Sequence, residues 1–247
     1  MKHPEYINKL NKKIKQKNQT FSYEKPVLNY EYSIFYCCDE CSNSEDMQTL
    51  IKILEIANCT YKIISNDACC GYPSYIIGNW VNMHNQIKKS IEHIKINNLK
   101  NIIILNPVCK KMMNDVWYDF SYTHPLKIIE VPTLLSNLIN QGKISPNIRI
   151  NLNTTFHESC LTEEKTKSEY LDLLKQIPGI HLYNINSEKN PCGGGSFIYN
   201  LYPYISKKLS ETAIKKYLKS NIELVICSNN FCVDSLTRSS TNFPIVI

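Results

Sequence analysis

The sequence has no long apolar run, and no apolar stretch follows closely behind Met1. Its longest uninterrupted aliphatic segment is Ile102–Leu105, far short of the roughly 20 residues that a membrane-spanning helix needs. A lysine-rich stretch without an apolar core follows Met1, so we expect no secretory signal and a cytoplasmic protein. Among the 247 residues, 43% are hydrophobic and 20% are charged, which excludes a wholly disordered chain and permits a folded core.

Net positive charge is concentrated in the N-terminal segment. The net charge is +6, and residues 1–25 carry seven lysines and two glutamates, or +5. We therefore predict a basic tail over residues 1–30, either a solvated arm or a docking arm for an acidic partner or a membrane surface. The other lysines are scattered, so no nucleic-acid-binding face is predicted.

Cysteine is abundant, with 11 residues. They are Cys37, Cys38, Cys41, Cys59, Cys69, Cys70, Cys109, Cys160, Cys192, Cys227 and Cys232. The odd number and the lack of a signal argue against a disulfide framework and favour metal or redox chemistry. Cys59 lies in a helical pattern and is predicted to be a small buried apolar residue.

The cysteines also reveal an internal repeat. Two sets of three share nearly the same spacing, 32 and 39 residues in the first set and 32 and 40 in the second. The sets are Cys38, Cys70, Cys109 and Cys160, Cys192, Cys232. Glycine follows the middle cysteine of each set, and an aliphatic run precedes the last one. We predict two homologous halves, 31–147 and 148–247.

Short aliphatic segments alternate with helical patterns in both halves. Strands are predicted at 33–36, 61–64, 101–105, 127–131, 148–156, 180–183, 223–226 and 244–247. Helices are predicted from Ser44 to Leu54, from Trp80 to Ile94, just after Cys109, over 134–139 with Gly142 as a stop, from Thr162 to 176, and over 205–218 with Pro203 in the first turn. The alternation predicts an α/β protein with two Rossmann-like halves, in which helices cover parallel sheets.

The predicted fold places the cysteines together. Each cysteine of the two sets follows a predicted strand, as does the neighbouring pair Cys69–Cys70. The carboxyl ends of parallel strands lie along one edge of a sheet, where ligands bind. Cysteine loops that are far apart in sequence should therefore converge within each half.

Thiolates bind zinc and iron–sulfur clusters. The first half offers Cys38, Cys69, Cys70 and Cys109, with Cys37 and Cys41 in reserve. Two neighbouring thiolates rarely reach one zinc ion without strain, whereas a cluster several ångströms across accepts both, and Gly71 permits close backbone approach. The alternative for this half is a zinc site or a set of free thiols.

These motifs resemble a known family. Cys38, Cys69-Cys70-Gly71 and Asn106-Pro107-Val108-Cys109 resemble one copy of the cysteine-rich CCG repeat, and a second copy is carried by His157-Glu158-Ser159-Cys160, Pro191-Cys192-Gly193 and Asn229-Asn230-Phe231-Cys232. The repeat occurs twice in iron–sulfur proteins of the heterodisulfide reductase type, and it is found in iron–sulfur subunits of lactate and glycolate oxidation. The resemblance covers nearly everything after the tail.

The resemblance implies a four-iron (4Fe–4S) cluster of non-cubane type, held by up to five thiolates. Three family cysteines are replaced here, by Asn106, Asn229 and Pro191. The implied cluster ligands are thus Cys38, Cys69, Cys70 and Cys109. In the second half Cys160, Cys192 and Cys232 would bind a metal more weakly, with Cys227, His157 or an exogenous ligand as the fourth.

The resemblance further implies an iron–sulfur subunit of a multi-subunit oxidoreductase that transfers electrons or reduces a disulfide. The chain has no ferredoxin-like run of Cys-x-x-Cys motifs and no Gly-x-Gly-x-x-Gly turn, so ferredoxin-like or flavoprotein partners would deliver electrons. Membrane association would be peripheral, through a partner. The alternatives are a structural or assembly subunit with zinc or a cluster in one half only, and a metal-free thiol enzyme that uses the Cys69–Cys70 pair.

Overall fold

The computed structural model describes residues 30–35, 44–64, 68–120, 126–185, 191–195, 198–240 and 244–246. The predicted basic tail up to residue 29 lies outside these ranges, as do Cys37, Cys38 and Cys41. The chain divides into two compact units, Met1–Leu134 and Leu135–Ile247. The domain boundary that the sequence favours, after residue 147, stays a prediction.

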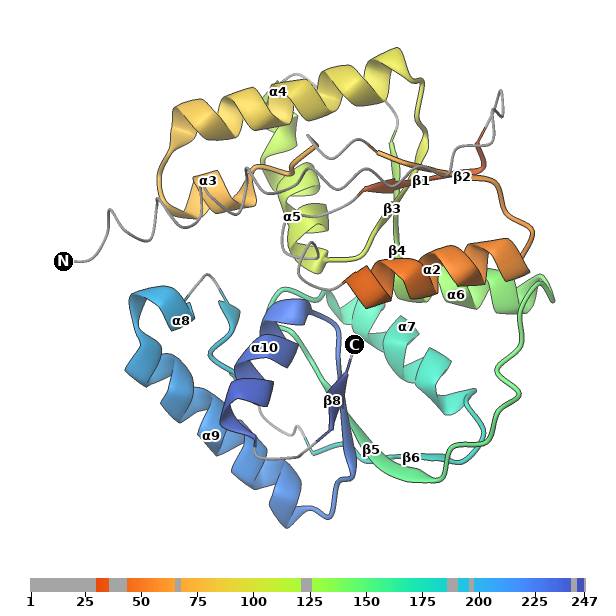
Figure 1. Cartoon of the computed structure of the whole chain (residues 1–247), viewed down its shortest axis with the longest axis vertical. Coiled ribbons are helices and arrows are strands. Elements are labelled where there is room, and N and C mark those ends of the chain that lie inside the picture. The colour runs from red at the N-terminus through yellow and green to blue at the C-terminus, as the bar shows by residue number, and fades with distance from the viewer. Residues whose placement is uncertain are drawn as a thin grey trace. The chain divides into compact units, whose positions relative to one another are not determined.

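The first unit contains a four-stranded sheet in the order β2-β1-β3-β4, with every neighbouring pair parallel (Figure 1). Its strands are β1 (Tyr32–Phe35), β2 (Tyr61–Ile63), β3 (Asn101–Ile104) and β4 (Lys127–Glu130). Ile102, Ile103 and Ile104 are almost fully buried, because helices cover both faces of the central strand β3. Burying each such side chain stabilises the fold by about 1.5–3 kcal/mol.

The helices of this unit cover both faces of the sheet. They are α2 (Ser44–Ile56), α3 (Tyr72–Ile76), α4 (Trp80–Ile96) and α5 (Pro107–Asp115), with a short 3-10 turn η2 (Trp117–Phe120). Helix α6 (Val131–Asn140) begins in this unit and crosses the boundary after Leu134. Helix α2 lies on one face, and α4 and α5 lie on the other (Figure 1). Cys59 is buried after α2, as the sequence predicts.

The second unit repeats this arrangement, with a parallel sheet in the order β6-β5-β7-β8. Its strands are β5 (Leu152–His157), β6 (Ile180–Leu182), β7 (Leu224–Cys227) and β8 (Ile245–Val246), and its helices are α7 (Glu164–Lys175), α8 (Ile198–Leu201), α9 (Pro203–Lys219) and α10 (Asn230–Ser239). The long helices α4 and α9 both contain 17 residues, and each is followed by an asparagine with positive φ, Asn98 and Asn221. The predicted fold class, two repeated α/β halves with parallel sheets, is confirmed.

Some predicted boundaries are wrong, and three of them have a clear local reason. Helix α5 begins before Cys109 and contains it, because the Asn106 side chain caps the helix and Pro107 fits its first position. Thr162 does not open α7, which begins at Glu164, since the Thr162 hydroxyl instead lies 3.0 Å from that of Ser228. Strand β5 begins at Leu152 rather than at residue 148. Leu152 pairs with Ile180, the first residue of the partner strand β6.

Two other helix signals are confirmed. Pro203 occupies the first turn of α9, and Gly142 follows α6 with a φ of 67°. Within the ranges given above, no helix combines the length and the apolar character needed to cross a membrane.

Candidate functional site

In the first unit, two of the predicted cysteines meet at the carboxyl edge of the sheet. Cys70 lies in the loop between β2 and α3, and Cys109 lies in the first turn of α5. Their sulfur atoms are 3.3 Å apart, and both residues are 1% exposed. Cys69 is buried beside them, while Cys38 falls outside the described residues. Convergence is thus observed for the part of the predicted set that the structure describes.

The Cys69–Cys70 loop is fixed by hydrogen bonds from two later elements. The Ser90 hydroxyl on α4 accepts from the Cys69 amide at 2.9 Å and donates to the Cys69 carbonyl at 3.0 Å. The Trp117 indole donates to the Cys70 carbonyl at 3.0 Å. Gly71 then turns the chain with a φ of 90°, a conformation that suits glycine. These contacts hold both thiols at the edge of the sheet.

Asn106 and Asn229, which stand where the family has a cysteine, have a structural role. Each caps a helix, since the side-chain oxygen of Asn106 accepts from the Val108 amide at 2.9 Å and that of Asn229 accepts from the Phe231 amide at 2.8 Å. The following cysteine, Cys109 or Cys232, therefore lies in the first helical turn. The partial positive charge of a helix N-terminus favours an anion near these turns.

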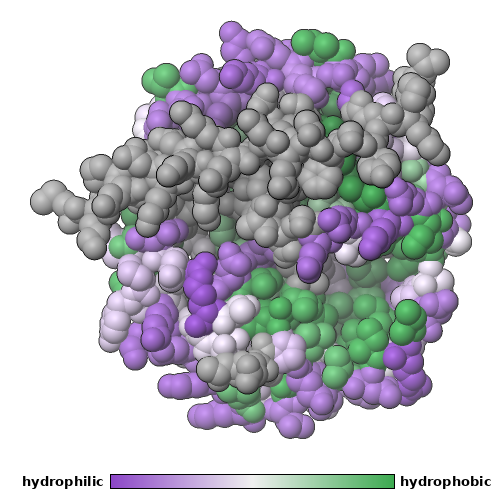
Figure 2. Space-filling model, in the orientation of Figure 1, coloured by the Kyte–Doolittle hydropathy of each residue, from purple (hydrophilic) through white to green (hydrophobic). Residues whose placement is uncertain are grey.

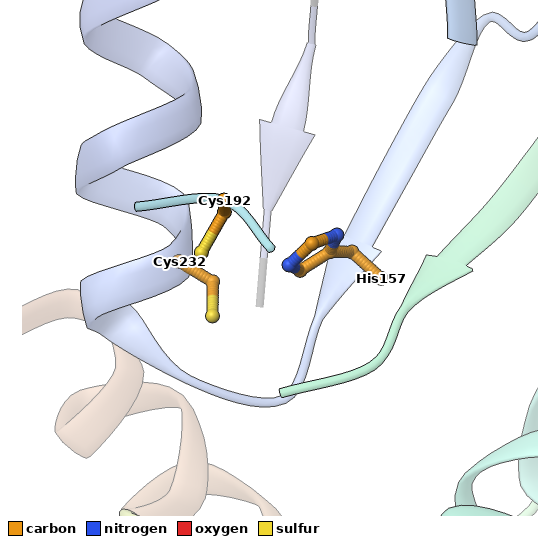
Figure 3. Close-up of side chains that lie close together, drawn as sticks. All are labelled: His157, Cys192 and Cys232. Carbon is orange, nitrogen blue, oxygen red and sulfur yellow. The ribbon is translucent and has the colours of Figure 1, made fainter. Parts of the chain in front are cut away.

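The second unit contains a different group of buried ligands. His157 ends β5, Cys192 lies in the loop before α8, and Cys232 lies in the first turn of α10. One ligand atom from each of the three residues lies within 4.8 Å of the other two, and all three side chains are buried (Figure 3). Among the residues with described positions, no other group of three such ligands occurs.

Glycine and serine contacts fix the Cys192 loop. Gly193 has a φ of 73°, and a side chain there would meet the backbone of Ser206 at 2.6 Å. Gly194 packs even more closely on the Phe231 carbonyl, which an added Cβ would overlap. The Ser235 hydroxyl donates to the Cys192 carbonyl at 2.6 Å, as the Trp117 indole does to the Cys70 carbonyl in the first unit. The two loops are therefore held in corresponding ways by different side chains.

The sulfur atoms of this group influence each other's ionisation. A hydrogen bond from Cys232, assisted by His157 and the Gly194 amide, outweighs burial and lowers the pKa of the Cys192 thiol to about 4. The same hydrogen bond, together with burial, raises the pKa of Cys232. Burial also raises the pKa of Cys227, and the Cys192 charge adds to this effect. The pair is therefore best described as a Cys192 thiolate that accepts a hydrogen bond from a neutral Cys232 thiol.

His157 has a second buried partner. Its Nδ1 atom lies 2.6 Å from the Tyr217 hydroxyl on α9, and the two rings meet edge to face. In the close-up, the other ring nitrogen points towards Cys192 and Cys232 (Figure 3). Burial is the main cause that raises the pKa of Tyr217, so its phenol is protonated at neutral pH.

Cys160 stands apart from the three-residue group. It is exposed, and its sulfur would lie 3.7 Å from a side chain placed at Gly195. The sequence ranked Cys160 above His157 as a metal ligand. A comparison of the strand ends could have identified His157 as a candidate ligand. His157 and Cys227 stand in the repeat where the first unit has the apolar residues Phe35 and Ile104.

The surface of the second unit carries an apolar area on the face seen in Figure 2, among otherwise polar side chains. The three-residue group is not part of that surface, because His157, Cys192 and Cys232 are 1%, 6% and 4% exposed. The site is therefore an interior one, closed to bulk water.

Parts of both units match known proteins in sequence. The family model of the CCG cysteine-rich domain matches residues 32–114 and again residues 154–237. "Lactate utilization protein A" of Halalkalibacterium halodurans is 22% identical over 198 residues, which cover 74% of this chain and 78% of that protein.

Two longer proteins are also similar. A subunit of "Fumarate reductase (CoM/CoB)" of Methanothermobacter marburgensis is 22% identical, over 74% of this chain and 36% of its own length. "Probable iron-sulfur-binding oxidoreductase FadF" of Bacillus subtilis is 20% identical, over 75% of this chain and 27% of its own length. The present chain thus spans only about a third of these two relatives. With both of its halves matched by the family model, the chain belongs to the CCG family of cysteine-rich domain proteins and carries the domain twice.

Proposed function

We propose that this protein is an iron–sulfur subunit of a multi-subunit oxidoreductase, and that Cys38, Cys69, Cys70 and Cys109 hold its cluster. The observation that carries the proposal is the buried meeting of Cys70 and Cys109, with Cys69 next to them in the same loop. Four thiolates are the ligand set of a four-iron cluster. When bound, such a cluster supplies one-electron chemistry.

The surroundings of these thiols suit an anionic group. The side-chain nitrogen of Asn106 is buried and has no hydrogen-bond partner among the described residues. A buried N–H group without a partner costs about 1–3 kcal/mol, which an acceptor in the site would offset. The first turn of α5 adds favourable electrostatics, and the burial of Cys70 and Cys109 excludes water from them.

The names of the relatives support the wider assignment. One is called an iron-sulfur-binding oxidoreductase, and another is called a subunit of a fumarate reductase. Because both are much longer than this chain, we propose that ferredoxin-like or flavoprotein partners deliver the electrons. We place the complex in the cytoplasm, where clustered thiols stay reduced.

In its more specific form, the proposal is a non-cubane cluster that acts on a thiol or disulfide substrate. The neighbouring thiols Cys69 and Cys70 favour a ligand larger than one metal ion. Reducing a disulfide to two thiols consumes two electrons and two protons, so a partner subunit must supply the electrons. Disulfide reduction by the assembled complex, with no activity in the isolated chain, is the expected result.

Iron and sulfide analysis of anaerobically purified protein tests the proposal. We expect about four iron and four sulfide per cluster-bearing chain, which a Cys109→Ser variant should lose. A Cys59→Ser variant is the matched control, because Cys59 is buried in the same unit but lies away from the site. Zinc without sulfide, or a Cys109→Ser variant with its full iron content, would contradict the proposal.

A structural or assembly subunit is the second candidate. It is favoured by Asn106 and Asn229, whose side-chain oxygens are committed to capping their own helices and so offer no ligand. Visible absorption that bleaches on reduction would argue for the redox subunit. A colourless chain that nonetheless assembles with its partners would argue for the structural role.

A further inference from the structure

We infer that the second unit binds a single tetrahedral metal ion, of which Zn²⁺ is the best match, through His157, Cys192 and Cys232, with Cys227 as the fourth ligand. Tyr217 is the positioning residue that orients His157. The inference concerns the second unit alone and does not depend on the cluster proposed for the first.

The three donor atoms are spaced for one ion. Zinc–sulfur bonds of about 2.3 Å and zinc–nitrogen bonds of about 2.0 Å place two tetrahedral ligand atoms roughly 3.5–3.8 Å apart. The ligand atoms of His157, Cys192 and Cys232 all lie within 4.8 Å of one another, so small side-chain adjustments suffice. A set of one histidine and three cysteines is also a common zinc site.

The same residues fit a four-iron cluster poorly. Pro191 occupies the place of the first cysteine of the adjacent pair, and Asn229 caps α10 instead of offering a thiolate. The buried donor set therefore contains a nitrogen and fewer thiolates than the set in the first unit. Histidine and cysteine together suit zinc.

Cys227 lies outside the group of ligand atoms within 4.8 Å of one another, and it is assigned as the fourth ligand from the sheet register. It pairs with His157 across β5 and β7, so the two side chains leave neighbouring strands at the same level. Cys227 is fully buried and belongs to the same cluster as Cys192 and Cys232.

Tyr217 fixes the direction of the imidazole. Its hydroxyl lies 2.6 Å from Nδ1, which leaves the opposite nitrogen, Nε2, to face the sulfurs (Figure 3). A metal-bound histidine commonly makes a hydrogen bond through its other nitrogen, and this contact sets the tautomer and the ring orientation. With the ion bound through Nε2, Nδ1–H donates to the Tyr217 oxygen.

The repeat supports this assignment. Counting along the matched strands and helices, His157, Cys227 and Tyr217 fall where the first unit has Phe35, Ile104 and Ile94. In the first unit these positions are buried and apolar. Burying polar side chains at these three positions costs free energy unless each group interacts with a partner. A bound metal ion would be that partner for His157 and Cys227, and Tyr217 pairs with His157.

A zinc titration of the full-length protein tests the inference. The metal-free chain is titrated with Zn²⁺ in competition with a chromophoric chelator, and zinc is also counted after gel filtration. We expect one tightly bound equivalent of zinc, which is lost in Cys192→Ser and in His157→Phe. The phenylalanine in the second variant is the residue that the first unit has at the corresponding position. Cys59→Ser should keep it.

Tyr217→Phe provides a test that does not remove a ligand. It retains the ring and deletes only the hydroxyl, and we expect a 10- to 100-fold loss of zinc affinity. Tyr202→Phe, at an exposed position of the same unit, should leave the affinity unchanged. Circular dichroism confirms that each variant is folded.

Three results would overturn the inference. Full zinc affinity in folded His157→Phe protein would show that His157 is not a ligand. Full affinity in folded Tyr217→Phe protein would show that Tyr217 does not position the imidazole. Full zinc affinity in Cys227→Ser would show that Cys227 is not the fourth ligand. A loss of about four irons in Cys192→Ser, relative to the wild-type protein, would show that the second unit holds a cluster. The iron content of Cys109→Ser reports on the first unit separately, so failure of one proposal is distinguishable from failure of the other.

Discussion

The two units share a scaffold but differ in what they place at the edge of the sheet. Both have the same strand order, a positive-φ glycine after the loop cysteine, and an asparagine-capped helix that begins just before the last cysteine. The first unit ends its two central strands with the apolar residues Phe35 and Ile104, whereas the second ends them with His157 and Cys227.

This difference separates two kinds of requirement. The glycines and the asparagine caps satisfy the backbone, which has the same shape in both units whatever is bound. The strand-end side chains contact whatever occupies the site, so they can differ when the ligand differs. A repeated scaffold can thus carry two chemically distinct sites.

The largest expected effect comes from removing the central thiol of the first unit. Cys70→Ser should abolish most of the iron, sulfide and visible absorption of the protein, because it removes a buried thiol in contact with Cys109. Cys192→Ser should remove a smaller share or none. The measurement is iron and sulfide content with electron paramagnetic resonance of the reduced protein, and equal losses would show that the two sites are alike.

The loop glycines should separate the units in stability. Gly193→Ala places a Cβ 2.6 Å from the Ser206 backbone and also strains a positive φ, so we expect a loss of roughly 3 kcal/mol in the free energy of unfolding. Gly71→Ala meets only the Ile87 and Met83 side chains, which can shift, and should cost roughly 1–2 kcal/mol.

Urea denaturation can follow the units separately. Both tryptophans, Trp80 and Trp117, lie in the first unit, so their fluorescence reports on it alone. Far-UV circular dichroism follows both units. If Gly71→Ala proved the more damaging of the two, the close packing described at Gly193 would be wrong.

The smallest effect is expected where the units are most alike. Asn106→Ala and Asn229→Ala should each lower the free energy of unfolding by about 1 kcal/mol, since each removes one capping hydrogen bond. Asn106→Asp keeps the acceptor and should stay close to the wild-type value in the metal-free protein. A cost for one asparagine only would show that the two caps are not equivalent.

Much of the fold could be predicted because its strands are short, aliphatic and evenly spaced. The pattern of Ile102–Leu105 predicts a buried strand, and β3 occupies most of it. Boundaries failed where a single side chain decides them, as at α5, where the Asn106 cap starts the helix two residues before Cys109. The sequence identified Asn106 as a missing ligand but not as a cap, because both roles fit an asparagine before a proline.

The site was predictable in part. The rule that parallel strands end at one edge correctly brought Cys70 to Cys109 and Cys192 to Cys232. It could not rank His157 against Cys160, since both lie at or just after the end of the same strand. The end of the strand distinguishes the two residues. His157 is the last residue of β5 and is buried, whereas Cys160 lies three residues later and is exposed.

The sequence by itself thus determined the repeat, the fold class, the strand-end position of the cysteines and the chemistry of thiol ligands. These follow from spacing and local pattern, which the chain carries in one dimension. Only the tertiary structure decided that His157, Cys192 and Cys232 share one buried site, that Tyr217 holds the imidazole, and that Cys227 faces the same level of the sheet. Those relations depend on strand register and on the packing of α9 against the sheet, which bring His157 together with residues that lie 35 to 75 positions further along the chain.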